Sequence, residues 1–380
     1  MVFSCDRKTL LAAVKRTAKA AASSSKVEIL TGILLSADAE NYELFLAATD
    51  LNLSITCTVA APVSRSGRAV VNAKLFVEML SLLGGQTVEV QLLPQNQLEV
   101  SSGSTRYRIA CLPADDFPVP QFSEPAGEVE IGRIKSLAKQ TVFAAAKTGS
   151  SVMQCIRLEL TLDSLRAVGC DGNILSSVRR QNDGSGSAGL LIPASALSLL
   201  AGLTGDEETL LLSSDGKQAV FRSPEQGMTF AIRLGVGSYL DVDSVLSCVS
   251  KQYEAIVDAT MFRDALDHVN ALAEPGSSLV NLVFSLGLLS LSCESAAGSA
   301  KNEIPAQVTA IMPPEGFCYQ GKKLLQGIQT MTGPIQLTVS DTGLLLVSGG
   351  EQSFFQAPSK KHAAKAAKKS RTKKKTAKAA

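Results

Sequence analysis

The chain has 380 residues, of which 45% are hydrophobic and 19% are charged, which is the composition of an ordinary globular protein. Its apolar runs are far shorter than the roughly 20 residues that a membrane helix needs, so the sequence excludes a membrane-spanning protein. The formal net charge of +2 hides an asymmetry, because residues 359–380 contain ten Lys or Arg and no acidic residue. The remaining body has 27 basic and 35 acidic residues.

The first predicted elements form a pattern that recurs along the chain. A helix is predicted at residues 7–22, and its counterparts are predicted at 131–148 and 258–273, because apolar residues recur there at helical spacing. Two short half-alternating strands follow each of these helices. The predicted strand pairs are 33–37 with 43–47, 156–160 with 164–168, and 281–285 with 288–292. An acidic residue comes after each second strand, at Asp50, Asp171 and Glu294.

A second helix is predicted to start near Asn72, near Pro193 and near Gln320. Two strands and then a third edge segment follow each of these helices, and the edge segments are residues 107–110, 229–234 and 354–356. The three helix starts are 121 and 127 residues apart. That period is too long for a solenoid repeat, which is typically about 20–50 residues, but it is the length of a small domain.

We therefore predict an α+β chain of three similar domains, each built from two helix-plus-strands units. The predicted domains are residues 1–124, 125–249 and 250–358, because stretches with Pro, Ser and Gly lie near both boundaries. Residues 359–380 are predicted to be a disordered basic tail, since they contain no apolar residue larger than Ala. A DNA-binding role for this tail and a role in solubility both remain open.

Basic residues gather on one face of the first two opening helices. Lys8, Lys15 and Lys19 lie opposite the apolar stripe of the first helix, and Lys135 and Lys139 share a face of the second. The third opening helix carries Asp264 and Asp267 as well as Arg263, so it does not continue the basic face. An ordinary solvated helix surface is the alternative interpretation.

Neither a metal site nor an enzyme is indicated. The eight Cys are scattered with no C-x-x-C spacing, and His268 and His362 lie in no pattern typical of a metal ligand or a catalytic base. We expect reduced thiols, no cofactor and no catalytic residue. The N-terminal segment is not an apolar signal sequence, so we expect a cytoplasmic protein.

Several segments resemble one known family. Thr49-Asp50-Leu51, the run Leu112-Pro113-Ala114-Asp115-Asp116-Phe117-Pro118 and the pair Asp171-Gly172 are similar, in order and spacing, to the bacterial DNA polymerase III beta subunit, the sliding clamp. The resemblance covers about residues 1–358. It implies a dimeric ring with helices lining a central hole and sheets outside, associated with the nucleoid.

The resemblance also implies partners and sites. Partners would be double-stranded DNA bound without sequence specificity, DNA polymerase III and clamp-loader subunits bound through short linear motifs, and a second copy of the chain. The residues expected to face DNA are Lys8, Lys15, Arg16, Lys19, Lys135 and Lys139, with Lys368, Lys369, Arg371, Lys373, Lys374 and Lys375 of the tail. The expected partner-peptide pocket comprises Met153, Cys170, Gly172, Asn173, Ile174, Leu175, Leu240, Ser244, Val245, Phe355, Ala357 and Pro358. The expected subunit seam comprises Leu82, Tyr107, Ile109, Ala271 and Leu272.

The sequence departs from the family at the expected pocket. The family's His-Arg after the glycine is Asn173-Ile174 here, its proline near the second-domain edge is Leu240, and its usual ending is replaced by Ala357-Pro358-Ser359-Lys360. Two functions therefore remain open. The first is a processivity clamp that tethers a polymerase to DNA. The second is a degenerate or mobile-element-encoded accessory homologue that binds DNA and a dedicated partner without enzymatic activity.

Overall fold

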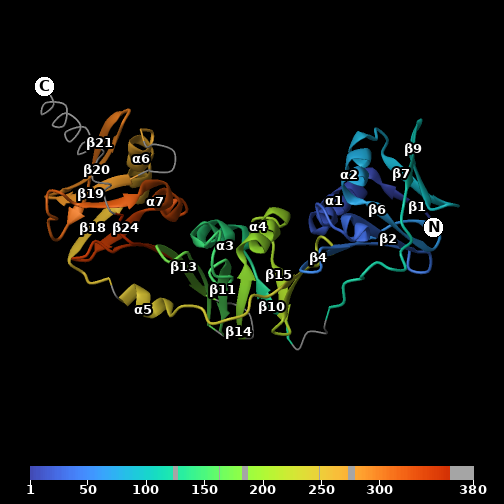
Figure 1. Ribbon diagram of the computed structural model, residues 1–380, viewed down its shortest axis with the longest axis horizontal. Coiled ribbons are helices and arrows are strands. Elements are labelled where there is room, and N and C mark those ends of the chain that lie inside the picture. Colours follow the sequence, from blue (N-terminus) through green and yellow to red (C-terminus); the bar gives the residue numbers. More distant parts are fainter. Residues whose placement is uncertain (123–126, 162, 182–186, 248, 273–278, 360–380) are drawn as a thin grey trace, which may run out of the picture. The chain divides into compact units, whose positions relative to one another are not determined.

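The computed structural model describes residues 1–122, 127–161, 163–181, 187–247, 249–272 and 279–359. The chain divides into two compact units, and Figure 1 labels many of their helices and strands. The first unit contains the described parts of residues 1–138, 155–166 and 181–237, and the second contains the described parts of residues 139–154, 167–180 and 238–380. The predicted second domain contributes to both units, and the three-domain boundaries stay a prediction.

The first unit is built mainly of antiparallel sheet. Its helices are α1 (Arg7–Thr17), α2 (Ala73–Leu82) and α4 (Ala194–Leu203). Its strands are β1 (Val2–Asp6), β2 (Gly32–Asp38), β3 (Glu43–Thr49), β4 (Leu53–Ala60), β5 (Val63–Arg65), β6 (Gly67–Asn72), β7 (Thr87–Leu93), β8 (Gln97–Ser102), β9 (Thr105–Ala110), β10 (Val129–Ile131), β11 (Cys155–Leu160), β14 (Ala188–Pro193), β15 (Leu210–Ser214), β16 (Gln218–Ser223) and β17 (Met228–Arg233).

These strands form two sheets and a pair. The five-stranded sheet has the order β5-β1-β7-β8-β9, and the eight-stranded sheet has the order β10-β15-β16-β17-β4-β3-β2-β6. Strands far apart in sequence meet in the larger sheet, where Phe230 of β17 lies opposite Ile55 of β4. β11 pairs with β14. Helices α1 and α2 pack side by side (Figure 1), and they bury Leu10, Val14, Phe76 and Leu80.

The second unit repeats this plan. Its helices are α5 (Val242–Ser247), α6 (Ala259–Asn270) and α7 (Gly321–Ile328). Its strands are β18 (Tyr253–Asp258), β19 (Leu279–Ser285), β20 (Leu288–Ser295), β21 (Gly298–Pro305), β22 (Gln307–Val308), β23 (Phe317–Gln320), β24 (Pro334–Val339), β25 (Leu345–Gly349) and β26 (Gln352–Gln356). Three elements lie across the division between the units: α3 (Ile134–Thr141), β12 (Ser164–Cys170) and β13 (Ile174–Gln181).

Within the second unit, β13 adds to the edge strand of a sheet with the order β26-β25-β24-β18-β22. The other sheet has the order β21-β20-β19-β23. Helices α6 and α7 pack side by side, and their apolar faces join one large core that includes Phe262, Leu266, Leu324 and Phe354.

The predicted α+β class and the sixfold repeat are confirmed. Each repeat reads strand, helix and then three strands, from β1-α1-β2-β3-β4 to β23-α7-β24-β25-β26. The helix starts are local in origin. Asn72, Pro193 and Gln320 are the N-cap residues of α2, α4 and α7, and the Asn72 side chain accepts a hydrogen bond from the backbone N–H of Leu75 at 3.0 Å.

Some predicted boundaries were wrong. The helix predicted at 131–148 covers only 134–141, because residues 129–131 are strand β10 and Val142–Ala144 turn into a short 3₁₀ helix. The helix predicted at 7–22 likewise becomes 3₁₀ after Thr17. A short strand precedes each opening helix, namely β1, β10 and β18, and neither these strands nor the helix α5 were predicted from the sequence.

The recurring acidic position has a structural role in two of the three domains. Asp50 Oδ1 accepts hydrogen bonds from the backbone N–H groups of Asn52 and Leu53, at 2.9 and 2.7 Å. Asp171 Oδ1 does the same for Asn173 and Ile174, both at 2.9 Å. These bonds build the turns before β4 and β13, as Asp side chains commonly do. Glu294 instead lies inside β20.

Candidate functional site

The basic residues of α1 lie on its solvent side. Lys8, Lys15 and Lys19 are exposed and Arg16 is half-buried, while Leu10, Ala13, Val14 and Thr17 are buried on the opposite side. None of the four basic residues forms an ion pair with a carboxylate of the described residues. Lys8 is near the Asp6 carboxylate at the start of the helix, so the charge of Lys15, Arg16 and Lys19 is the part of this face that has no ion-pair partner among the described carboxylates.

The basic residues of α3 are exposed too, but one of them is partnered. Lys135 Nζ lies 3.1 Å from Asp206 Oδ1, and both side chains are well exposed, so this ion pair is weak. Lys139 is exposed, one helical turn further along α3.

Helix α6 differs, as its sequence predicts. Asp264 and Asp267 are exposed on it. The Arg263 guanidinium is turned to the protein, where it donates hydrogen bonds to the carbonyl oxygens of Gln329 at 3.1 Å and Met331 at 3.4 Å.

An apolar cluster in the second unit gathers many of the expected pocket residues, and we call it the Phe355 cluster. Its members come from β12, β13, β25, β26, the segment around α5, and the residues just before β11 and β25. The buried members are Val168, Cys170, Leu175, Val242, Val249 and Phe355, and the half-buried members are Met153, Tyr239, Leu240, Val245, Leu246, Leu344 and Leu346. Six of the expected pocket residues therefore lie together: Met153, Cys170, Leu175, Leu240, Val245 and Phe355.

The other expected pocket residues lie beside this cluster or away from it. Gly172 and Asn173 are exposed in the turn that Asp171 holds, and Gly172 has a φ of +93°, which favours glycine. The backbone N–H of Ala357 donates to the Asn173 carbonyl at 2.8 Å, so Ala357 lies next to that turn. The side chain of Ile174 is buried in the large core of the second unit instead.

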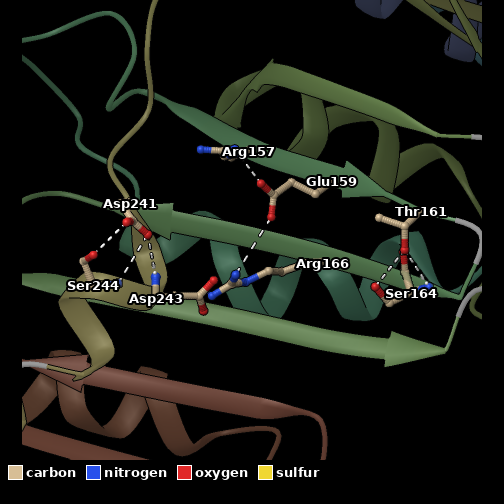
Figure 2. A network of polar contacts seen from close by, with 8 residues as sticks. All are labelled: Arg157, Glu159, Thr161, Ser164, Arg166, Asp241, Asp243 and Ser244. Atoms are coloured by element: carbon tan, nitrogen blue, oxygen red, sulfur yellow. Dashed lines mark hydrogen bonds and ion pairs between the residues drawn. The ribbon is translucent and has the colours of Figure 1, made fainter.

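Of the remaining two, Pro358 follows Ala357 and is half-buried. Ser244 lies near the start of α5, and its hydroxyl already donates a hydrogen bond to Asp241 Oδ2 at 2.6 Å (Figure 2). Asp241 Oδ1 also accepts from the backbone N–H groups of Asp243 and Ser244. The Ser244 side chain therefore helps to form the helix rather than presenting a free hydroxyl.

Seven residues of the Phe355 cluster were missed by the sequence analysis. Val242, Leu246 and Val249, together with the expected Val245, have the spacing of one helical face, which would have indicated α5. Val168, Tyr239, Leu344 and Leu346 come together only through the fold. The Tyr239 hydroxyl donates to the Val168 carbonyl at 3.3 Å, and Leu346 lies opposite Phe355 in the sheet.

Cys170 is an apolar wall residue in this cluster. It is 5% exposed, and burial raises the pKa of its thiol above the usual value, against an opposing contribution from the backbone N–H of Gly172. A raised pKa keeps the thiol protonated near neutral pH, and a protonated thiol is a poor nucleophile.

Two of the expected seam residues lie on an edge strand, and the other three lie at helix ends. Tyr107 and Ile109 are half-buried on β9, the last strand of the five-stranded sheet, and Leu82 ends α2 with 69% of its surface exposed. Ala271 and Leu272 follow α6, and Ala271 is its C-cap residue.

Figure 2 also shows two sets of polar contacts in the first unit that stabilise the strands β11 and β12 and the turn between them. Glu159 on β11 lies between Arg157, at 2.5 Å, and Arg166, at 4.0 Å. Thr161 and Ser164 close the turn between β11 and β12, where the Ser164 N–H donates to Thr161 Oγ1 at 3.0 Å. In the described part of the chain, no group of three or more His, Cys, Asp or Glu residues is placed to hold a metal ion.

The six expected DNA-facing residues of the basic tail lie outside the described residues. None of the helices in the described residues has the length and apolar character required to cross a membrane.

Comparison with known proteins gives consistent results. Residues 1–121 match the family model described as the DNA polymerase III beta subunit, N-terminal domain. The beta sliding clamp of Staphylococcus aureus is 26% identical over 321 residues, which cover 80% of this chain and 84% of that protein.

Solved structures resemble the whole described chain. A crystal structure of a putative DNA polymerase III beta subunit from Eubacterium rectale superposes with a TM-score of 0.88 at 20% identity, covering 95% of this chain and 100% of that chain. The sliding clamp of Pseudomonas aeruginosa bound to griselimycin has a TM-score of 0.85 at 20% identity, with the same coverage of both chains. At these identities the structural likeness establishes the fold.

Proposed function

We propose that this chain, a divergent member of the DNA polymerase III beta subunit family, is a sliding clamp that encircles duplex DNA and tethers a DNA polymerase and other partners to it. One observation carries the proposal: the similarity continues well beyond the matched N-terminal domain and covers 80% of this chain in its Staphylococcus aureus relative. A clamp is a non-catalytic processivity factor, so we assign no reaction to the chain. A clamp acts on DNA in the cytoplasm, and we propose that this chain associates with the nucleoid there.

The proposal gives the exposed face of α1 a function. A sliding protein needs attraction to phosphates that is independent of sequence, because base contacts would stop it. Lys15, Lys19 and the half-buried Arg16 supply positive charge and form no ion pair with a described carboxylate, while Lys8 lies near the Asp6 carboxylate. Lys139 is a further exposed positive charge, on α3. Lys135 contributes less, because Asp206 is 3.1 Å away.

A ring requires a seam between two copies. β9 ends one sheet of the first unit and β21 ends one sheet of the second, and an open edge can pair with a strand of another chain. We propose that β9 of one copy meets β21 of the other, with Tyr107, Ile109, Leu82, Ala271 and Leu272 around the contact. A head-to-tail contact of this kind closes into a ring when the rotation allows it.

We further propose that the Phe355 cluster binds the partner peptides. An apolar surface with a few polar groups at its margin suits an extended peptide with apolar anchors. Asn173, Ala357 and Pro358 lie at that margin.

Native mass measurement of the full chain tests the proposed assembly. We expect a dimer of about 80 kDa, twice the mass of the 39.8 kDa chain, at micromolar concentration. Replacing Tyr107 and Leu272 with Asp should give monomers that still fold. A wild-type monomer at micromolar concentration would contradict the ring and favour the accessory homologue.

The basic tail is proposed to add non-specific DNA affinity. Its ten Lys and Arg residues would release counterions from DNA, so deletion of residues 359–380 should weaken binding to duplex DNA and flatten its salt dependence. Fluorescence anisotropy between about 50 and 200 mM salt measures both effects. An unchanged salt slope would leave the tail with no role in DNA binding.

A further inference from the structure

The two strands that support the Phe355 cluster have a second, polar side. In the pairing of β13 with β26, Leu175 lies opposite Phe355 and Ser176 lies opposite Phe354. Because neighbouring strand residues point to opposite faces, Leu175 and Phe355 face the cluster while Ser176, Phe354 and Gln352 face the other way. Ser176, Phe354 and Gln352 are almost fully buried.

On this second face one side chain joins four separate segments. The Gln352 Nε2 group donates to Ser176 Oγ at 3.1 Å, to the Gly327 carbonyl at 3.0 Å and, more weakly, to the Gln140 carbonyl at 3.5 Å. Its Oε1 atom accepts from Thr330 Oγ1 at 2.7 Å. We call Gln352, Ser176 and the groups they contact the Gln352 pin.

Ser176 completes the pin. Its hydroxyl donates to the Gln140 carbonyl at 2.6 Å while its oxygen accepts from Gln352. The end of α3, strand β13, strand β26 and helix α7 are therefore linked by a buried group of hydrogen bonds. Buried networks in which each polar atom has a partner fix one arrangement of the groups around them.

The packing around the pin leaves little room for adjustment. A Cβ atom at Gly327 would lie 2.5 Å from the Phe354 ring, so α7 approaches β26 as closely as glycine permits. The Phe354 ring packs on Phe143, with centroids 5.9 Å apart. Lys323 of α7 also donates from Nζ to the Phe143 carbonyl at 2.8 Å, although burial lowers the pKa of its ammonium group.

We propose that Gln352 and Ser176 are positioning residues for the partner-binding surface, since they fix the register and spacing of β13 and β26 from the face opposite the Phe355 cluster. Both side chains face away from the Phe355 cluster. A shift of one residue between these strands would exchange the two faces, so the pin holds Leu175 and Phe355 where a peptide anchor would meet them. This inference rests on the proposed role of the Phe355 cluster.

The chain provides a matched control on the same strand. Gln356 is also a buried glutamine of β26 that faces away from the cluster, and it is 1% exposed. Its Nε2 atom donates to the Gln320 carbonyl at 3.3 Å, outside the pin. Gln352→Leu and Gln356→Leu therefore remove the same chemical group from the same strand, but only the first removes the link to Ser176.

The test compares binding of griselimycin, the ligand in the Pseudomonas aeruginosa structure, with thermal stability in full-length variants. We expect Gln352→Leu to weaken binding by about tenfold, the size expected for one or two lost net hydrogen bonds. Gln356→Leu removes a single hydrogen bond of 3.3 Å, so it should lower the melting temperature by less than Gln352→Leu does and change the affinity by less than about twofold. Ser176→Ala, a milder change, should weaken binding by an intermediate factor.

Hydrogen exchange supplies a readout that requires no ligand. Gln352→Leu and Ser176→Ala should speed exchange of the amides in residues 174–178 and 352–356 while the strands of the first unit stay protected. If wild-type protein binds griselimycin and Gln352→Leu binds it as tightly as Gln356→Leu does, the pin has no positioning role. If wild-type protein shows no binding, the proposed Phe355 surface fails first, and the inference falls with it.

Discussion

Helices α1 and α6 belong to the first and fifth of the six repeats, and they share their buried side but not their exposed side. Each begins at an Asp cap, Asp6 or Asp258, whose carboxylate accepts a backbone hydrogen bond in the first turn. Each also buries apolar residues at helical spacing, including Leu10 and Val14 in α1 and Phe262 and Leu266 in α6.

The exposed sides differ in charge. α1 presents Lys8 and Lys15 and contains no acidic residue, while α6 presents Asp264 and Asp267. Packing and capping constrain the buried side of a repeat, but its solvent side is free to acquire a separate function. The two helices therefore have the same kind of buried side, which stabilises the fold, and different exposed sides, which can carry different functions.

The largest expected effects come from substitutions on the buried sides of α1 and α6. Leu10→Ala should lower the free energy of unfolding by about 2–5 kcal/mol and Phe262→Ala by about 3–5 kcal/mol, because both side chains are fully buried. Chemical denaturation measures both changes. Met261→Ala is the control, since that side chain is 44% exposed and should cost less than about 0.5 kcal/mol. A cost below 1 kcal/mol at Leu10 would show that α1 is not held by its apolar face.

The next largest effect comes from substitutions on the exposed basic side of the first helix. Replacing both Lys15 and Lys19 with Glu should reduce affinity for short duplex DNA at least tenfold at low salt, and it should lower the magnitude of the salt slope by roughly two if each contacts a phosphate. The matched change on α6, in which Asp264 and Asp267 become Lys, should not weaken binding. Equal losses from the two pairs would remove the functional distinction between the helices.

The smallest effect concerns the caps. Hydrogen bonds from Thr9 lower the pKa of Asp6 below its usual 3.8, so the cap stabilises the fold above that pH. The contribution is lost as the pH falls through the lowered value, where the carboxylate becomes protonated. Asp6→Ala should therefore lower the melting temperature at pH 7 and have a smaller effect near pH 3, while Asp6→Asn should retain most of the cap. If Asp6→Ala lowered the melting temperature equally at pH 7 and near pH 3, the carboxylate charge of Asp6 would not contribute to the cap.

Local signals in the sequence were enough for much of the fold. The N-caps at Asn72, Pro193 and Gln320 and the strands around 33–47 could be predicted because capping and alternation involve neighbouring residues. The short strand β1 was missed, although Val2, Phe3, Ser4 and Cys5 alternate in burial. The resemblance to a family supplied what the local patterns could not, which was the likeness of six units to one known assembly.

The site was less predictable, because it depends on contacts between distant residues. Nothing near Leu344 or Tyr239 in the sequence indicates that these residues meet Phe355, and the link from Gln352 to Ser176 spans 176 positions. The charge on α1 could be predicted residue by residue, since surface charge needs no partner. The fold itself decides which apolar residues gather in the Phe355 cluster.

Retention on a nicked circular plasmid, measured by gel filtration before and after a single-site restriction cut, tests the central claim most directly. A clamp that encircles duplex DNA should stay with the circle at a salt concentration that removes protein bound only by charge, and it should leave within minutes of linearisation. Equal retention on circular and linear DNA, or loss from both at that salt, would contradict topological binding.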